Sequence, residues 1–229
     1  MPLGVPKVPT SEFEFDDDYG YFPNYSYYDD DEGGPKKKKK EWIDLFNRLQ
    51  EDRIIFVFND FKDEATNLVI GLMLLLADEE PEEAIYLYIN SSGGHVINGI
   101  AIHNMMTLVE AGVYTLGMGK AASMAAFVLA SGTRKRAAFP NTRVMIHQPQ
   151  VKFSTEDYET SLDMIGDAEY VMHLRLMIAD YFAQRGKKPV WMVFDDMERD
   201  FFMTAHEAVD YGIIDFVMFE DDDEDEDED

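Results

Sequence analysis

The sequence contains no cysteine among its 229 residues. Without cysteine the chain can form neither a disulfide nor a thiolate zinc site, and catalysis by a cysteine nucleophile is excluded. This composition suits a reducing compartment. Long hydrophobic runs are missing as well, because the longest apolar stretch, Leu68 to Ala77, is far shorter than the roughly 20 residues that a membrane-spanning helix needs. We therefore expect no membrane span.

Basic residues are scarce: Lys and Arg number 20 against 46 Asp and Glu, and the formal net charge is −26. Binding of nucleic acid needs a basic face that displaces counterions from phosphates, so we expect no nucleic-acid partner. Much of the acidic excess lies in residues 11–32 and in the ten consecutive acids Glu220 to Asp229. The one basic block, Lys36 to Lys40, is interpreted as a solvated linker, with a binding patch as the alternative.

Length and composition predict one folded domain with attached tails. The domain is expected over residues 41–219, after an N-terminal segment over 1–40 and before a disordered acidic tail over 220–229. The opening residues lack the apolar core of a secretory signal, and the acidic residues that follow are unlike the basic, serine-rich composition of a transit peptide. We therefore expect that the protein is made in the compartment where it works.

Within the predicted domain, β-rich runs alternate with helical patterns. Strands are expected at residues 54–58, 84–89, 113–117, 136–139, 143–147 and 213–219. Helices are expected from about 41, over about 64–76, 97–110, 155–184 and 205–211, and from about 121. Repeated strand–helix–strand units predict an α/β fold with a parallel, right-handed sheet.

The strongest chemical signal is the segment Gly117 to Phe127, in which glycines at a strand end lead into a helix. This places Ser123 at the first helical turn, where backbone N–H groups lack helical partners and the helix dipole favours negative charge. Such a setting suits acyl transfer, because negative charge develops on the carbonyl oxygen when a serine attacks it. The N–H groups of Met124 and Gly94 are candidate donors to that oxygen. Taken alone, however, a serine among alanines is more often a small packing residue, and a Gly-Gly after a strand is more often only a turn.

A serine nucleophile needs a base, and histidine has the appropriate pKa range near neutral pH. His147 ends a predicted strand just before Pro149, which places its ring at an edge, while His95 beside Gly94 is an alternative. Structural or surface roles are expected for the other histidines, which are His103, His173 and His206. Asp200 leads from a helix end into apolar residues, the setting of a partly buried carboxylate that orients an imidazole.

Several separated segments resemble, in order and spacing, the proteolytic subunits of the Clp protease family. They are Tyr86 to Ser91, Gly93-Gly94, Ala121 to Met124, Arg143 to Pro149 and Met197 to Asp200. The first nine residues and Asp196 to Asp200 look like the plastid-encoded form. The resemblance implies a Clp/crotonase-type α/β fold of repeated strand–helix units, with a protruding handle helix after His147. It also implies stacked heptameric rings that enclose a chamber in the plastid, in the chloroplast stroma.

By this resemblance Ser123 is the nucleophile of a serine endopeptidase, His147 its general base and Asp200 the acid that orients the base. The same resemblance makes the N–H groups of Gly94 and Met124 the oxyanion-hole donors. No metal or other cofactor is implied for this chain. The sequence has no Gly-x-x-x-x-Gly-Lys-Ser/Thr phosphate loop, so ATP is expected to be used by a partner AAA+ unfoldase.

The resemblance also implies contacts with partners: other proteolytic subunits, the unfoldase and unfolded polypeptide substrates. Tyr86 and Tyr88 match family residues around the pockets that receive unfoldase loops, and Leu108 falls where bacterial relatives carry an aromatic. Glu198 and Arg199 are expected to link ring contact to the geometry of Asp200, with an exposed salt bridge between these two residues as the alternative.

Some features depart from the family pattern, and three alternative functions stay open. Ser92 stands where the family usually has proline, Lys120 and Ala125 are unusual beside the catalytic turn, and the insertion over 11–40 leaves the axial gate undefined. One alternative is a non-catalytic subunit of a mixed ring. The others are a crotonase-like acyl-CoA enzyme and a serine–lysine peptidase that uses Lys120.

Overall fold

The computed structural model describes residues 6–9, 42–150 and 161–218. Its centre is a sheet with the strand order β3 (Ile54–Val57), β4 (Ile85–Ser91), β5 (Val113–Ala122), β6 (Arg136–Ala138) and β9 (Phe216–Val217). All these neighbours are parallel, and two further strands, β7 (Arg143–Ile146) and β8 (Phe201–Thr204), extend the sheet beside the second half of β5. The predicted fold class, a Clp/crotonase-type α/β fold, is confirmed.

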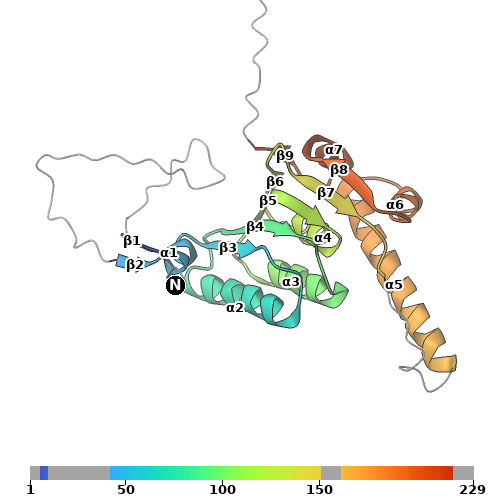
Figure 1. Ribbon diagram of the computed structural model, residues 1–229, viewed down its shortest axis with the longest axis horizontal. Helices are drawn as coiled ribbons and strands as arrows, with labels where there is room; N and C mark the ends of the chain where they lie inside the picture. Colours follow the sequence, from blue (N-terminus) through green and yellow to red (C-terminus); the bar gives the residue numbers. More distant parts are fainter. Residues whose placement is uncertain (1–5, 10–41, 151–160, 219–229) are drawn as a thin grey trace, which may run out of the picture.

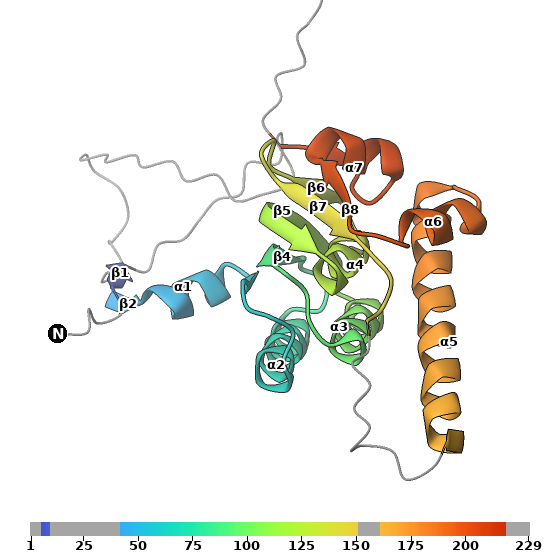
Figure 2. The same cartoon turned by 45° about the vertical axis from the view of Figure 1, so that its right-hand side comes forward.

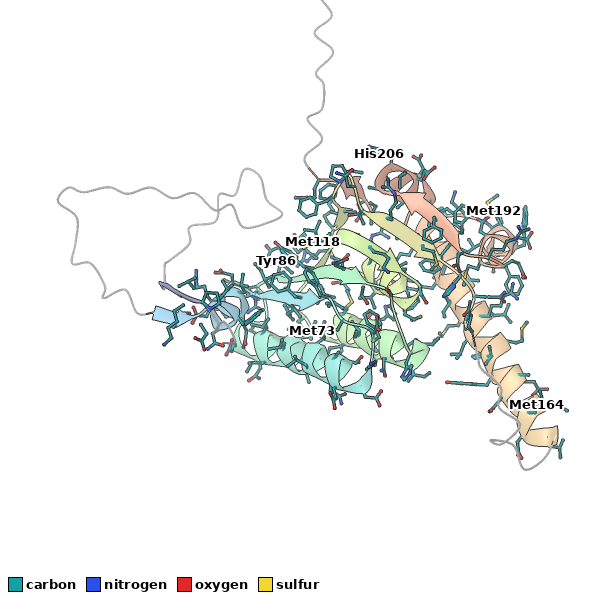
Figure 3. All side chains as sticks on the ribbon, viewed as in Figure 1. Met73, Tyr86, Met118, Met164, Met192 and His206 are labelled. Carbon is teal, nitrogen blue, oxygen red and sulfur yellow. The ribbon has the colours of Figure 1, made fainter. Side chains whose placement is uncertain are left out.

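The helices that follow the strands cover the sheet, and one of them projects from the domain (Figure 1). They are α1 (Leu45–Glu51), α2 (Asp63–Glu79), α3 (Val96–Leu108), α4 (Met124–Ala130), α5 (Ser161–Gly186), α6 (Val190–Asp196) and α7 (Ala205–Tyr211). The long rod α5 stands beside the domain and extends beyond it, as Figure 2 shows. Met164, near the end of α5 that lies far from the sheet, is exposed (Figure 3). This agrees with the predicted handle helix.

The amphipathic helix α2 illustrates how the sequence produces these layers. Its buried residues are Thr66, Val69, Met73 and Leu76, and their spacing of three and four residues forms one stripe along a helix. That stripe faces the sheet, whereas Leu68, Leu74 and Leu75 on other sides of the helix are exposed. Among the described residues, no helix has both the length and the apolar character needed to cross a membrane.

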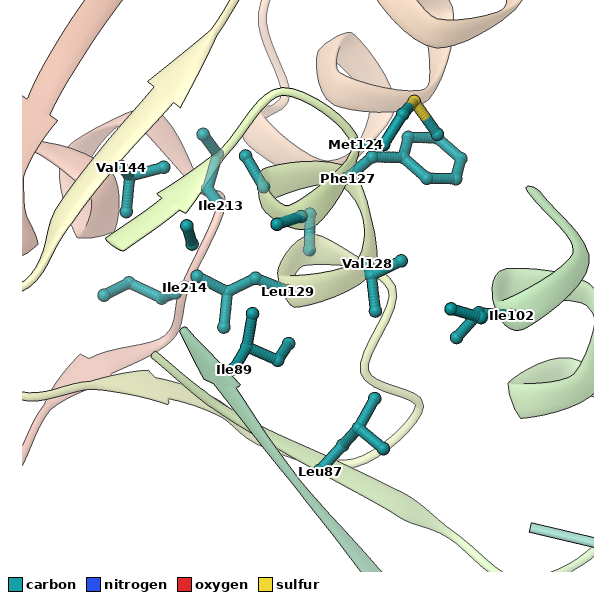
Figure 4. Packing of buried hydrophobic residues seen from close by; sticks show 14 of the residues in the cluster. Leu87, Ile89, Ile102, Met124, Phe127, Val128, Leu129, Val144, Ile213 and Ile214 are labelled. Atoms are coloured by element: carbon teal, nitrogen blue, oxygen red, sulfur yellow. The ribbon is translucent and has the colours of Figure 1, made fainter. Parts of the chain in front are cut away.

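Helix α4 lies at the centre of the hydrophobic core. All seven of its residues are buried, which explains why its sequence is apolar on every side. Figure 4 shows this packing, with side chains from α4 surrounded by those of β4, α3, β7 and the segment after α7. The labelled residues are Leu87, Ile89, Ile102, Met124, Phe127, Val128, Leu129, Val144, Ile213 and Ile214. The helix that begins beside Ser123 is therefore held rigidly.

Two predicted element starts are wrong. The first half of β5 pairs with β6, and Lys120 to Ala122 pair with β7. Because of this second pairing, β5 continues through its glycines to Ala122. The helix expected from about Ala121 therefore begins only at Met124. The first helix begins at Leu45 and not near residue 41, since Trp42–Asp44 form strand β2, which pairs with β1 (Lys7–Pro9).

The last predicted strand is shorter than expected, since only Phe216–Val217 of the predicted range 213–219 form β9. The predicted start of the long helix at about residue 155 lies outside the described residues, as do the acidic tail over 220–229 and most of the N-terminal segment over 1–40. The lysine block over 36–40 and the acidic stretch over 11–32 lie outside them too. The proposed domain boundaries stay predictions.

A buried arginine joins the end of α2 to the start of β3 and β4. Arg53 is only 6% exposed and has a positive φ of 59°. Its Nε donates to the carbonyl oxygen of Ala84 at 3.0 Å, and its Nη2 donates to those of Leu76, Glu80 and Glu83 at 2.9, 3.1 and 3.0 Å. A cation at this position also complements the negative end of the helix dipole.

We predict that Arg53→Met lowers the free energy of unfolding by roughly 3–5 kcal/mol, because several buried carbonyl groups lose a charged donor at once. Denaturant unfolding followed by circular dichroism measures this change. The matched control is Lys62→Met at an exposed position before α2, for which the change should stay within about 0.5 kcal/mol. Equal changes in the two variants would show that the carbonyl cluster does not need Arg53.

Candidate active site

Strand β7 lies between the two segments that carry the candidate nucleophile and the candidate acid. On one edge it runs parallel to β5, with Ala122 paired to Met145. On the other edge it runs antiparallel to β8, with Ile146 paired to Phe201. Because His147 follows Ile146 directly, it extends beyond both ladders at the point where the neighbouring segments also leave the sheet.

Ser123 occupies the single position between the end of β5 and the start of α4. Its N–H donates to the carbonyl oxygen of Met145 at 2.8 Å, which continues the parallel ladder by one residue. Its backbone angles, φ 57° and ψ −125°, lie in a region that residues with a side chain rarely adopt, and such strain gathers at functional turns. Although Ser123 stands at the N-cap of α4, its hydroxyl does not cap the helix. The Oγ atom instead lies 2.9 Å from Nε2 of His147.

The imidazole of His147 connects Ser123 to Asp200. Nδ1 of His147 lies 2.9 Å from Oδ1 of Asp200. Extending the antiparallel register one step beyond Ile146–Phe201 places His147 opposite Asp200, where cross-strand side chains are close. The structure therefore brings Ser123, His147 and Asp200 together in one hydrogen-bonded series.

Asp200 is more exposed than its hydrogen-bond partner His147. Its side chain is 55% exposed, whereas that of His147 is 18% exposed. The physical reason is that Asp200 lies in the short turn between α6 and β8, and the apolar residues that follow it include Phe202, which is itself 61% exposed.

The Gly93-Gly94 loop packs against the turn at Ser123. A Cβ atom on Gly93 would lie 2.6 Å from the carbonyl oxygen of Ala122 and 2.8 Å from the backbone nitrogen of Met124, so only glycine fits. The loop is held from its other side, because N–H of Phe61 donates to the carbonyl oxygen of Gly93 at 2.8 Å.

The N–H groups of Gly94 and Met124 have no acceptor within the part of the chain that the structure describes. Both residues adjoin the contact between Gly93 and the turn at Ser123. Two free donors beside a serine hydroxyl are what an oxyanion site requires.

A small pocket opens beside Ser123 and His147. The other residues that line it are Val96, Met124, Pro149, Ile178 and Phe182. All of these are apolar, and they come from α3, α4, the segment after β7 and α5. Ile178 and Phe182 lie on α5, and the motifs around Ser123 and His147 gave no indication that they belong to the site. The only signal of these two residues in the sequence was their i, i+4 spacing on a predicted helix.

The alternative bases occupy other positions. His95 is exposed at the N-cap of α3, and Lys120 is exposed on β5, where its N–H donates to Oδ1 of Asn90 at 3.1 Å. Within the described residues, the hydroxyl of Ser123 contacts neither of them and has His147 as its hydrogen-bond partner. The structure therefore does not assemble the serine–lysine arrangement.

The remaining histidines have structural or surface positions. His103 lies against the rings of Phe127 and Tyr181, with centroids 5.4 and 5.0 Å away. Burial lowers the pKa of His103, and the nearby charge of Arg185 lowers it further. His173 and His206 are exposed on α5 and α7. Among the described residues, no group of histidine, aspartate and glutamate has the arrangement of a metal site.

The two tyrosines of β4 lie on the same face of the sheet, because alternate residues of a strand point to one side. Tyr86 stacks on Tyr114 with ring centroids 5.2 Å apart, and Tyr88 meets Phe56 edge-on at 5.6 Å. Both tyrosines are half-buried, while Phe56 is 37% exposed. These rings form an aromatic surface on β3, β4 and β5, away from Ser123.

The predicted pair of Glu198 and Arg199 is not an ion pair within the described residues. The carboxylate of Glu198 binds the guanidinium of Arg175 on α5, while Arg199 is exposed. Sequence reasoning did not identify Arg175 as part of this region, because nothing in the local pattern of α5 connects it with a residue beyond the next helix.

Comparisons with known proteins agree with this geometry. A family model described as Clp protease matches residues 37–221. The protein named ATP-dependent Clp protease proteolytic subunit from Lotus japonicus is 43% identical over 222 residues, which cover 96% of this chain and 100% of that protein. Proteins of the same name from Nicotiana tabacum and Populus trichocarpa are 40% identical over 222 residues and 43% identical over 219 residues. They cover 96% and 95% of this chain, and 100% and 98% of their own lengths.

We predict that Gly93→Ala lowers kcat/KM for a short peptide by about a hundredfold, because displacement of a reacting group by about 1 Å has an effect of this size. A fluorogenic peptide assay on the assembled protein measures it. Gly71→Ala is the matched control, since a Cβ there meets nothing within 4 Å and the same substitution in α2 should leave activity unchanged. Full activity of Gly93→Ala would contradict the close packing of this loop against the turn at Ser123.

Proposed function

This chain belongs to the Clp protease family, and from that membership we propose that Ser123, His147 and Asp200 are the catalytic triad of its peptidase activity. The chain is a proteolytic subunit of an ATP-dependent Clp protease and therefore a serine peptidase. One observation carries the assignment of the triad: Oγ of Ser123 lies 2.9 Å from Nε2 of His147, and Nδ1 of the same ring lies 2.9 Å from Oδ1 of Asp200.

The geometry supports the following reaction. The Asp200 carboxylate accepts the Nδ1–H of His147, which leaves Nε2 free to accept the hydroxyl proton of Ser123. Oγ of Ser123 then attacks the peptide carbonyl carbon, and the carbonyl oxygen becomes an oxyanion. The N–H groups of Gly94 and Met124 are proposed to stabilise this oxyanion. The C–N bond then breaks as His147 passes its proton to the leaving amine, which leaves an acyl-serine. In the second half of the reaction His147 takes a proton from water, the resulting hydroxide attacks the acyl carbon, and the bond to Oγ breaks as His147 returns the proton to Ser123 and the carboxylic acid product is released.

The pocket beside the triad supports a preference in the substrate. Its lining residues other than Ser123 and His147 are apolar, so we propose that it receives an apolar side chain on the acyl side of the cleaved bond. Burial of such a side chain is favourable, whereas a charge would lose its water without gaining a partner.

The proposed assembly and partners rest on the family and on the exposed apolar surface of the chain. Along α5 the exposed apolar residues are Leu162, Met164, Ile165, Tyr170, Met172, Leu176 and Met177. Exposed apolar surface of this extent is typical of a protein interface, and we propose that α5 joins two heptameric rings of proteolytic subunits. The aromatic surface around Tyr86 and Tyr88 is the proposed site for the loops of an AAA+ unfoldase, which supplies ATP hydrolysis and unfolded polypeptide.

The plant relatives support localisation in a plastid. We propose that the chain is encoded in the plastid and works in the chloroplast stroma, where it degrades proteins in turnover and quality control. The support for plastid encoding is the likeness of the first nine residues and of Asp196 to Asp200 to the plastid-encoded form of the family.

We predict that Ser123→Ala abolishes hydrolysis of a fluorogenic peptide and that His147→Ala reduces it by about a thousandfold or more, because the serine loses its base. Native mass spectrometry of the same preparations should show unchanged assembly, since neither substitution removes core packing. Lys120→Met serves as the control and should retain activity. Substantial turnover by the assembled Ser123→Ala variant would refute the proposed triad.

We also predict that Tyr88→Ala weakens unfoldase-dependent degradation of a folded protein at least about tenfold more than hydrolysis of a short peptide, because an aromatic anchor at an interface contributes much of the binding energy. Both rates are measured on one assembled preparation, with ATP and the unfoldase present. Tyr88→Phe keeps the ring and should behave like the unmodified protein. Equal losses in both assays would indicate damage to the fold and not loss of docking.

A further inference from the structure

Arg175 is a buried cation on α5 that reaches the segment carrying Asp200. The whole residue is 9% exposed. Its guanidinium lies over the ring of Phe194, with Cζ 3.6 Å from the ring centroid. Its Nη2 donates to the carbonyl oxygen of Phe194 at 3.3 Å and to the carboxylate of Glu198. One side chain of α5 therefore contacts α6 and the turn just before Asp200.

The turn over residues 198–200 is fixed at both of its ends. On the far side, Phe201 enters the antiparallel ladder opposite Ile146. On the near side, the carbonyl oxygen of Met197 accepts the N–H of Gln148 at 2.8 Å, and Met197 is fully buried. Within the turn itself, Glu198 is the residue that Arg175 binds.

The carboxylate of Asp200 has little support of its own. It is 55% exposed, and within the described residues its hydrogen-bond partner is His147. The position of the carboxylate must therefore follow from the backbone of the turn. Because a catalytic group has to be held within a fraction of an ångström, the contacts that fix this backbone matter to the reaction.

We propose that Arg175 is a positioning residue, which holds the turn at Glu198 so that Asp200 meets Nδ1 of His147. The inference rests on the proposed triad and adds a residue that touches neither substrate nor triad. Arginine suits this role, since its planar guanidinium stacks on a ring while it donates in fixed directions, and lysine reproduces only the charge.

Helix α5 therefore contributes to the site in two ways. The same helix supplies Ile178 and Phe182 to the pocket beside Ser123 and supplies Arg175 to the turn before Asp200. A shift of α5 relative to the sheet would then alter the pocket and the orientation of the acid together.

The test is a double-mutant cycle between Arg175→Met and Asp200→Asn, measured as kcat and KM for a fluorogenic peptide. Arg175→Met alone should lower kcat by about ten- to a hundredfold and leave KM within about threefold, as expected for a misplaced catalytic group. In the Asp200→Asn background the same substitution should change kcat by less than about twofold, because residues that act through one another are not additive. The kcat of Arg175→Lys should lie between that of Arg175→Met and that of the unmodified protein.

Two further variants keep the test decisive. Arg185→Met removes another guanidinium of α5, one that contacts Tyr181, and should leave kcat within about twofold of normal. Glu198→Ala removes the half-exposed partner of Arg175 without changing the core, so it should lower kcat even if Arg175→Met fails to fold. Like Arg175→Met, Glu198→Ala should not lower kcat further when it is combined with Asp200→Asn.

The outcomes separate this inference from the proposed function. The inference is wrong if Arg175→Met and Glu198→Ala keep full activity. It is also wrong if these substitutions lower kcat by the same factor in the unmodified protein and in the Asp200→Asn background, because Arg175 then does not act through Asp200. If Ser123→Ala still hydrolyses the peptide, the proposed triad itself fails, whatever the Arg175 variants show.

Discussion

The pairing of β7 on both of its edges is the constraint on which the site depends. Val144 and Ile146 point into the core, and a slip of one residue would turn both toward the opposite face, so the register is strongly fixed. The parallel ladder with β5 then brings Ser123 beside the end of β7, and the antiparallel ladder with β8 brings Asp200 opposite His147. Three side chains that are far apart in the chain are thus aligned by backbone hydrogen bonds.

Apolar packing keeps this alignment rigid on the side of Ser123. Helix α4 is buried over its whole length, so Ser123, which precedes it, cannot relax from its strained backbone angles by moving the helix. Gly93 packs directly against the turn, where a side chain would collide with Ala122 and Met124. The strain at Ser123 is therefore maintained by close packing on two sides.

Much of the fold and the three residues of the proposed triad could be predicted from the sequence, because periodicity and short motifs are local signals. Ser123, His147 and Gly94 each stand in such a motif, and the structure brings Asp200 to His147 as expected. Other features depend on contacts between distant segments. The second half of β5 is a strand only because β7 pairs with it, and the exposure of Asp200 reflects a turn whose surroundings no local pattern describes. The ion pair of Arg175 with Glu198 joins residues 23 positions apart, with α6 between them, so it had no sequence signal.

The central claim is that the two ladders of β7 produce one activated serine, at position 123. The most direct measurement is covalent labelling of the assembled protein with a fluorophosphonate, followed by peptide mapping with mass spectrometry. The account predicts an adduct on Ser123 whose rate of formation falls by about a hundredfold or more in His147→Ala, because the hydroxyl then lacks its base. An adduct on a different serine, or labelling of Ser123 at an unchanged rate without His147, would contradict it.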